Sequence, residues 1–147
     1  MNMKMGERAV PGFFLVLLLL VSCRVSRDFP AEYKGDQIHF GQGGGFTGFV
    51  TSFMLLDDGR LFEKTHDSDW SYVSRWERAL TRQMFTDYAS LGLGSRDLNC
   101  PGDKYYFLEL YRNSEPLHHL TWGQEGCDPP SGARELYGIL YKSVTSK

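Results

Sequence analysis

The sequence predicts an α+β domain, in which an antiparallel sheet of about four to five strands carries two helices packed on one face. Segments rich in aromatic and β-branched residues come in two pairs, and a short turn sequence separates the members of each pair. Each pair is followed by a segment whose apolar residues recur every three or four positions, which is the period of a helix. Two hairpins, each followed by a helix, are therefore expected within a single domain at 36–147.

The first hairpin is expected around an Asp-Gly turn. Residues 37–40 form a short predicted strand that ends where a run of glycines begins, and residues 49–56 and 61–65 form two further strands. Asp58 and Gly59 lie between the last two strands, and both tolerate the positive φ that a type I′ turn requires. The sequence therefore predicts a two-residue hairpin turn at this point.

The first helix is expected over residues 74–91. Its apolar positions are spaced as on one face of a helix: Val73, Trp76, Leu80, Met84, Tyr88 and Leu91. Ser74 and Glu77 have the spacing of a capping box, in which each side chain accepts a hydrogen bond from a free amide of the first turn. Gly92 and Gly94 are expected to end the helix.

A second hairpin and a second helix complete the predicted domain. Residues 105–111 and 117–122 have strand character and flank Asn113 and Ser114, a candidate two-residue turn. Two prolines then precede Ser131, a suitable N-cap for the last helix. The residues expected to face the core from this helix are Leu136, Ile139, Leu140 and Val144.

Cys100 and Cys127 are predicted to form a disulfide. If Asn113 and Ser114 make a two-residue turn, the two cysteines have the numbers of residues that face each other across the hairpin. Apart from Cys23, these are the only two cysteines in the sequence, and a single pair in an exported protein also favours a disulfide. The Cys-x-x-Cys spacing of redox sites is absent from the sequence. Closing this loop is expected to stabilise the fold by about 3–4 kcal/mol.

The start of the chain has the pattern of an export signal. Lys4 and Arg8 precede an apolar run at 13–21, which is shorter than the roughly 20 residues that a membrane-spanning helix needs. The run leads into the sequence Leu20-Val21-Ser22-Cys23. This sequence resembles the lipobox of bacterial lipoproteins, so the chain is expected to be a lipoprotein.

The lipobox resemblance has consequences for three segments. It implies that a signal peptidase removes residues 1–22 and that Cys23 becomes a lipid-modified N-terminus, with residues 23–35 as a tether to the domain. Arg24 differs from the aspartate that retains such proteins in the inner membrane, so the resemblance implies an outer-membrane location facing the periplasm. An ordinary cleaved signal and an uncleaved N-terminal anchor are the alternatives.

Length and charge restrict the classes of partner. The 147-residue chain has 16 Lys and Arg against 18 Asp and Glu, and loss of residues 1–22 leaves 14 against 17. So weak and mixed a charge does not favour binding to nucleic acid or to an anionic surface. The 125 residues that remain are enough for one domain with a hydrophobic core.

The glycine run at 43–48 matches the G-x-G-x-x-G fingerprint of dinucleotide-binding proteins. That fingerprint works where glycines turn a strand into a helix, whereas here they precede a predicted strand. A turn or bulge at a sheet edge is therefore expected. Exposed amides could still bind an anion or a partner at Gly43, Gly44, Gly45 and Gly48.

No pattern in the sequence predicts catalytic residues, a metal site or a cofactor. His118 and His119 are adjacent on a predicted strand and so point to opposite faces, and His39 and His66 lie far away in the sequence. No metal-ligand spacing connects these histidines. Neighbouring aspartates such as Asp57 are expected to serve turns rather than acid–base chemistry.

Three short segments together carry a second resemblance. The segments at 43–48, 55–60 and 119–123 are similar to parts of small bacterial envelope lipoproteins, over roughly residues 36–144. The resemblance brings no established activity. We expect a non-enzymatic binding or accessory domain that is held to the membrane by its lipid and binds a protein or another envelope component. The alternative is an oxidoreductase that binds a nucleotide or flavin through the loop at 43–48.

Overall fold

The computed structural model describes residues 33–94 and 96–146. These residues include nearly all of the predicted domain at 36–147. The predicted signal peptide at 1–22, the lipidation site Cys23 and most of the tether lie outside the described residues.

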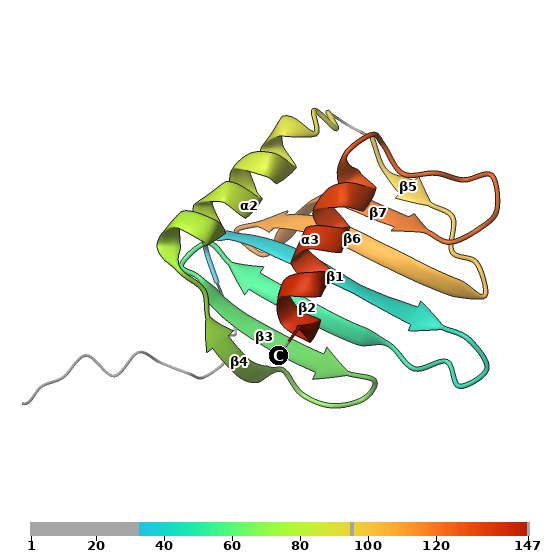
Figure 1. Cartoon of the computed structure of the whole chain (residues 1–147), viewed down its shortest axis with the longest axis horizontal. Coiled ribbons are helices and arrows are strands. Elements are labelled where there is room, and N and C mark those ends of the chain that lie inside the picture. Colours follow the sequence, from blue (N-terminus) through green and yellow to red (C-terminus); the bar gives the residue numbers. More distant parts are fainter. Residues whose placement is uncertain (1–32, 95, 147) are drawn as a thin grey trace, which may run out of the picture.

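The folded part is an α+β structure with one seven-stranded sheet, which is larger than the predicted sheet (Figure 1). Its strand order is β4-β3-β2-β1-β6-β7-β5, and every neighbouring pair is antiparallel except β5 and β7. The strands are β1 (Asp36–Gly44), β2 (Thr51–Leu56), β3 (Arg60–Thr65), β4 (Ser71–Arg75), β5 (Leu98–Asn99), β6 (Lys104–Arg112) and β7 (Glu115–Trp122). The sheet is therefore mixed, and both of its outermost strands were missed by the sequence pattern.

Two helices, α2 (Arg78–Ser90) and α3 (Ala133–Thr145), lie on the same face of the sheet, as expected (Figure 1). We call this the covered face. Alternate residues of the central strands point into it, because side chains along a strand point to opposite faces in turn. Its buried core includes Ile38, Phe40, Phe53, Leu55, Leu108, Leu110 and Leu120 from the sheet and Met84, Tyr88, Leu136, Tyr137 and Leu140 from the helices.

The first helix begins later than predicted. Ser74 belongs to β4, where it pairs with Leu61, and α2 starts only at Arg78. Glu77 has extended backbone angles and makes no side-chain capping hydrogen bond, so the predicted capping box is wrong. Pairing with β3 satisfies backbone groups that a helix would otherwise satisfy, and this non-local partner outweighs the local capping pattern.

The last helix begins within two residues of the predicted N-cap. Gly132, with φ of 83°, occupies the N-cap position in place of Ser131. Leu136 and Leu140 are buried as predicted, whereas Ile139 is 43% exposed. The same deviation occurs in α2, where Leu80 is 38% exposed. Each helix therefore buries a narrower stripe than its apolar pattern predicts.

The two hairpins use different turns. At β2–β3, the register leaves three residues, 57–59, in the loop. Gly59 N–H donates to the Leu56 carbonyl at 2.9 Å, and Gly59 is the only one of these three residues with positive φ. The predicted two-residue turn is wrong there, because Asp58 accepts a hydrogen bond from Arg60 N–H and remains at negative φ. At β6–β7, Asn113 and Ser114 both have positive φ and form the predicted two-residue turn.

The disulfide between Cys100 and Cys127 is present, but it does not span the β6–β7 hairpin. The register shifts at Leu110/Tyr111, so that Tyr106 lies opposite Trp122. Cys100 instead follows β5, on the other side of β7, where its N–H donates to the Thr121 carbonyl at 2.9 Å. The bond therefore joins the loop after β5 to the loop after β7, with a Cα–Cα distance of 6.3 Å.

Candidate binding site on the open face of the sheet

The second face of the sheet carries no helix in the described part of the chain, and we call it the open face (Figure 1). His39 lies between Ile38 and Phe40 of the covered core and therefore points to the open face. A small apolar cluster of Met54, Leu56 and Phe62 occupies one side of this face. The remainder, over β1, β6 and β7, is aromatic and polar.

Two glycines of β1 make room for aromatic rings from β6. Phe107 lies over Gly41, where its ring atoms come within 2.7 Å of the position that a Cβ would occupy. Tyr105 lies over Gly43 in the same way, at 2.6 Å. These rings cover the glycines, and β1 consequently continues to Gly44 instead of ending at residue 40 as predicted.

A cavity of about 440 Å³ lies beside the disulfide, and a second one of about 330 Å³ lies on the open face. We call the second the open-face site. Its lining residues come from four strands and from the loop before β4: His39, Ser52, Trp70, Tyr105, Phe107, Glu109, His119 and Thr121. Among these described lining residues none is Lys or Arg, so the only formal charges that the site can carry come from a carboxylate and two imidazoles.

Polar groups in the open-face site form a continuous hydrogen-bonded chain. The Thr121 hydroxyl lies 2.9 Å from His119 Nε2, and His119 Nδ1 lies 2.6 Å from Glu109 Oε1. The Tyr111 hydroxyl donates to Glu109 Oε2 at 3.1 Å. Glu109 and His119 are directly opposite each other on β6 and β7, so the sheet register places this pair.

Burial shifts the pKa values of two groups around this chain. Burial and the nearby Glu109 charge raise the pKa of Tyr111 to about 12, so its hydroxyl remains a donor at neutral pH. Burial lowers the pKa of His39 to about 4, so this imidazole is neutral at pH 7. His39 stacks on Tyr111 with ring centroids 4.4 Å apart, and its Nε2 lies 3.0 Å from Gln37 Oε1.

The order hydroxyl, imidazole, carboxylate also occurs in hydrolases that use a nucleophilic hydroxyl. In this protein Thr121 is only 5% exposed, and it lies two positions from His119 on the same strand. The side chain of His119, by contrast, is 45% exposed. The chain therefore fixes the orientation of Glu109 and His119 toward the cavity, which suits binding better than nucleophilic attack.

The predicted glycine loop contributes to this site through Gly43, which makes room for Tyr105, and its glycines are not themselves among the described lining residues. Gly43 and Gly44 belong to β1, and Gly45 and Gly48 close a turn in which Gly48 N–H donates to the Gly45 carbonyl at 3.1 Å. The chain then enters a strand, β2, and not the helix that dinucleotide binding requires. Nothing lies within 4 Å of the Cβ positions of Gly45 and Gly48, and the neighbouring Phe46 is fully exposed.

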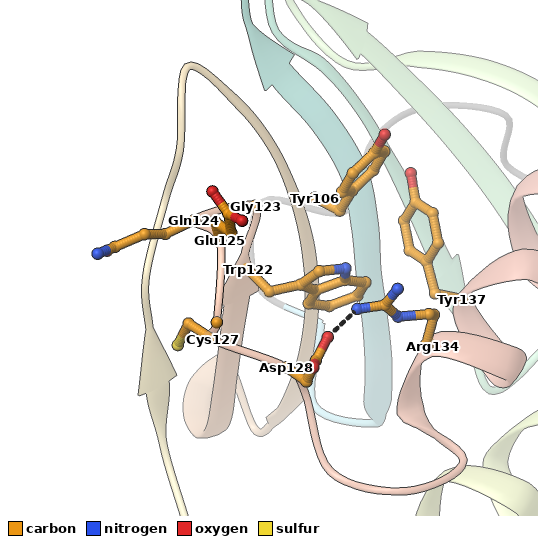
Figure 2. Close-up of a pocket in the computed structure, with 10 residues that line it drawn as sticks. Tyr106, Trp122, Gly123, Gln124, Glu125, Cys127, Asp128, Arg134 and Tyr137 are labelled. Atoms are coloured by element: carbon orange, nitrogen blue, oxygen red, sulfur yellow. Dashed lines mark hydrogen bonds and ion pairs between the residues drawn. The ribbon is translucent and has the colours of Figure 1, made fainter.

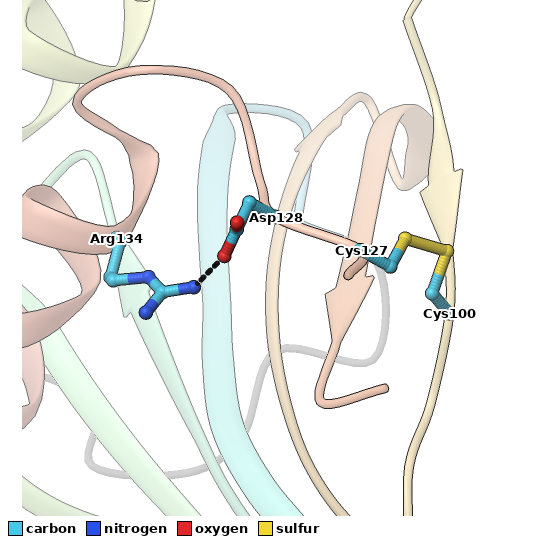
Figure 3. The surroundings of a disulfide bond; sticks show 4 residues. All are labelled: Cys100, Cys127, Asp128 and Arg134. Atoms are coloured by element: carbon cyan, nitrogen blue, oxygen red, sulfur yellow. Dashed lines mark hydrogen bonds and ion pairs between the residues drawn. A yellow bond between two sulfur atoms is a disulfide. The ribbon is translucent and has the colours of Figure 1, made fainter. Parts of the chain in front are cut away.

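The cavity beside the disulfide lies between the covered core and the loop after β7. Figure 2 shows Tyr106, Trp122 and Tyr137 gathered next to it, and Trp122 and Tyr137 are almost completely buried. Its outer wall is an exposed ion pair between Arg134 and Asp128, which adjoins Cys127 (Figure 3). Among its described lining residues, the polar side chains are connected by this one exposed ion pair, whereas the open-face site has a chain of four hydrogen-bonded side chains.

The histidines divide between the two faces as the alternation predicts. His118 stacks near Tyr88 on the covered side, whereas His119 lines the open-face site. The sequence did not reveal that His39 and His119 line the same cavity, because the pairing of β1 with β6 brings them there. Within 33–94 and 96–146, no three His, Cys, Asp or Glu side chains are placed to hold a metal ion.

Comparison with protein-family models gives no match for this chain, and neither does comparison with curated proteins. In the portion of the chain that the structure describes, no helix is both long enough and apolar enough to cross a membrane.

Proposed function

We propose that this protein is a lipid-anchored envelope protein whose folded domain binds an envelope component without catalysis. The anchor is assigned to Cys23, after removal of residues 1–22, and the location to the outer membrane facing the periplasm. This part of the proposal rests on the lipobox resemblance at 20–23. The binding role rests on the folded domain.

The observation that carries the binding role is the connected polar and aromatic cavity on the open face. Stability alone does not favour a carboxylate such as Glu109, whose side chain is only 14% exposed, at the centre of a sheet. His119 and Tyr111 satisfy and orient this carboxylate, and the Thr121 hydroxyl in turn holds His119. Concave sites with mostly apolar walls and a few fixed polar groups are typical of ligand binding.

The anchor is tested by a change of Cys23→Ala in the full-length protein. The unchanged protein is expected to partition with outer membranes, and the variant to lose its lipid, which mass spectrometry of the mature N-terminus detects. Metabolic labelling with an alkyne fatty acid provides a second measurement. Equal labelling of the variant and the unchanged protein would refute the anchor at Cys23.

The binding role is tested by retention of envelope material on the immobilised full-length protein in detergent. The paired change Tyr105→Ala and Glu109→Gln is expected to lower retention by about tenfold, the equivalent of 1.4 kcal/mol. Glu115→Gln is the matched control, because Glu115 is an exposed glutamate on β7 outside the site. Retention that is the same for both proteins would show that the open face is not the binding surface.

A further inference from the structure

We infer that the open-face site takes an uncharged carbohydrate, bound through one or two sugar rings. This inference rests on the proposed binding role of the open face and names the chemical class of its ligand. It follows from the shape of the site, from its polar groups and from its charge.

The shape of the site provides an aromatic floor. Tyr105 and Phe107 lie across Gly43 and Gly41, so ring surface replaces side chains that would otherwise project from β1. Trp70, from the loop before β4, also lines the cavity. The C–H faces of a sugar ring pack on such aromatic surfaces, because the ring faces carry partial negative charge and the C–H groups partial positive charge.

The polar groups lie beside the aromatic floor. Among the described residues, the Glu109 carboxylate has one partner for each oxygen, His119 for Oε1 and Tyr111 for Oε2. A carboxylate has about four acceptor positions, so Glu109 retains capacity for hydroxyl donors of a ligand. Ser52 adds a hydroxyl group to the same cavity. Sugar hydroxyls, which donate and accept, match this set.

The charge of the site disfavours anionic ligands. Phosphate and carboxylate groups are bound mainly by Arg, Lys or helix N-termini, and the described lining residues include no Arg or Lys. The carboxylate of Glu109 would repel such groups. A nucleotide, a flavin cofactor or an acidic sugar is therefore a poor fit, whereas a neutral sugar meets no opposing charge.

The size of the site limits the ligand to a small unit. At about 330 Å³ the cavity is near the lower end of the range for small-molecule sites. One or two rings would fill it, and the rest of a longer glycan would extend along the open face. A longer chain is therefore expected to gain little affinity beyond its first few units.

The test measures binding of defined probes to the full-length protein in a detergent that has no sugar headgroup. The probes are cellotriose, maltotriose and tri-N-acetylchitotriose as neutral glycans, with ADP and free L-tryptophan as ligands of other classes. Calorimetry gives the affinities. At least one neutral glycan is expected to bind, and ADP and tryptophan are not.

Two single changes locate the bound sugar. Glu109→Gln removes the charge and half of the acceptor capacity, and Tyr105→Ala removes part of the aromatic floor; each is expected to weaken binding by about tenfold or more. Glu115→Gln and Phe46→Ala, both at exposed positions outside the site, are expected to leave the affinity unchanged. Thermal unfolding of each variant confirms that it is folded, and Ser52→Ala replaces any variant that is not.

The outcomes separate this inference from the proposed binding role. Glycan binding that is insensitive to Glu109→Gln, Tyr105→Ala and Ser52→Ala would overturn it, as would tighter binding of ADP or tryptophan. If envelope material is retained through the open face but no neutral glycan binds, the sugar inference fails and the binding role stands. If retention does not depend on the open face, both fail.

Discussion

The two faces of the sheet are built from alternate residues of the same strands, yet different interactions hold their side chains. On the covered face, Ile38, Phe40 and Leu108 are completely buried beneath the helices. On the open face, their neighbours His39 and Glu109 are held by hydrogen bonds and ring contacts. The covered face therefore accounts for the stability of the fold, and the open face retains groups whose positions serve binding. Substitutions can separate these two roles.

The largest expected effect is on the covered face. Phe40→Ala deletes a completely buried ring that stacks on Phe53 with centroids 5.4 Å apart. It is expected to lower the free energy of unfolding by about 3–5 kcal/mol, as urea denaturation measures it. Glu109→Gln on the open face is the contrasting change and should cost far less. Equal losses for the two variants would contradict the division between the faces.

Loss of the disulfide is expected to come next. Replacing Cys100 and Cys127 by serine removes a crosslink between residues 27 positions apart. In the chain-entropy model this costs about 3–4 kcal/mol of unfolding free energy, with little change in the affinity of the open face for its ligand. The same urea titration measures the first quantity. A loss below about 1 kcal/mol would show that the unfolded chain is not restricted by this bond.

The open face is expected to make stability depend on pH through His39. Its pKa falls from the ordinary 6.5 to about 4 in the folded protein, so the unfolded chain binds more protons between these values. As the pH falls from 6.5 toward 4, His39 should cost the protein up to about 3 kcal/mol of stability, and this contribution of His39 should level off below pH 4.

His39→Gln provides the comparison, because glutamine does not titrate. Unfolding free energies measured from pH 7 to pH 4 should decline less steeply for this variant than for the unchanged protein. Parallel declines would mean that other groups cause the acid sensitivity.

The smallest expected effect concerns the orientation of Glu109. Tyr111→Phe removes the hydroxyl that donates to Glu109 Oε2 and keeps the ring that stacks on His39. Stability should fall by about 1 kcal/mol, whereas affinity for a ligand should change more than stability does. The two quantities are measured by urea denaturation and calorimetry. An unchanged affinity would show that Tyr111 does not position the carboxylate.

The sequence predicted those parts of the fold that depend on local pattern. Strand alternation identified β2, β3, β6 and β7, and helical spacing identified both helices. The missed strands, β4 and β5, are short; β4 pairs with the preceding strand β3, and β5 pairs with β7, which follows later in the sequence. Residues 71–75 carry no strong signal of their own, and β5 has only two residues.

The site was not predictable for a related reason. Glu109 and His39 lie 70 positions apart in the sequence and become neighbours only because β1 pairs with β6. Gly41 and Gly43 indicated a loop, since glycine weakens an isolated strand. The rings of Phe107 and Tyr105 fill the space above these glycines, and their positions depend on the same non-local register.

The small strand β5 also affects whether the edge of the sheet can pair with a strand of another copy of the protein. Its two residues pair with Leu120 and Thr121, and Asp97 accepts a hydrogen bond from His119 N–H at 3.0 Å. Together with Cys100, whose N–H donates to the Thr121 carbonyl, they cover the outer border of β7 from His119 to Thr121. A bare border would offer free N–H and C=O groups to a strand of another molecule, which is a route to polymerisation. The disulfide thereby ties this short covering strand to the loop after β7.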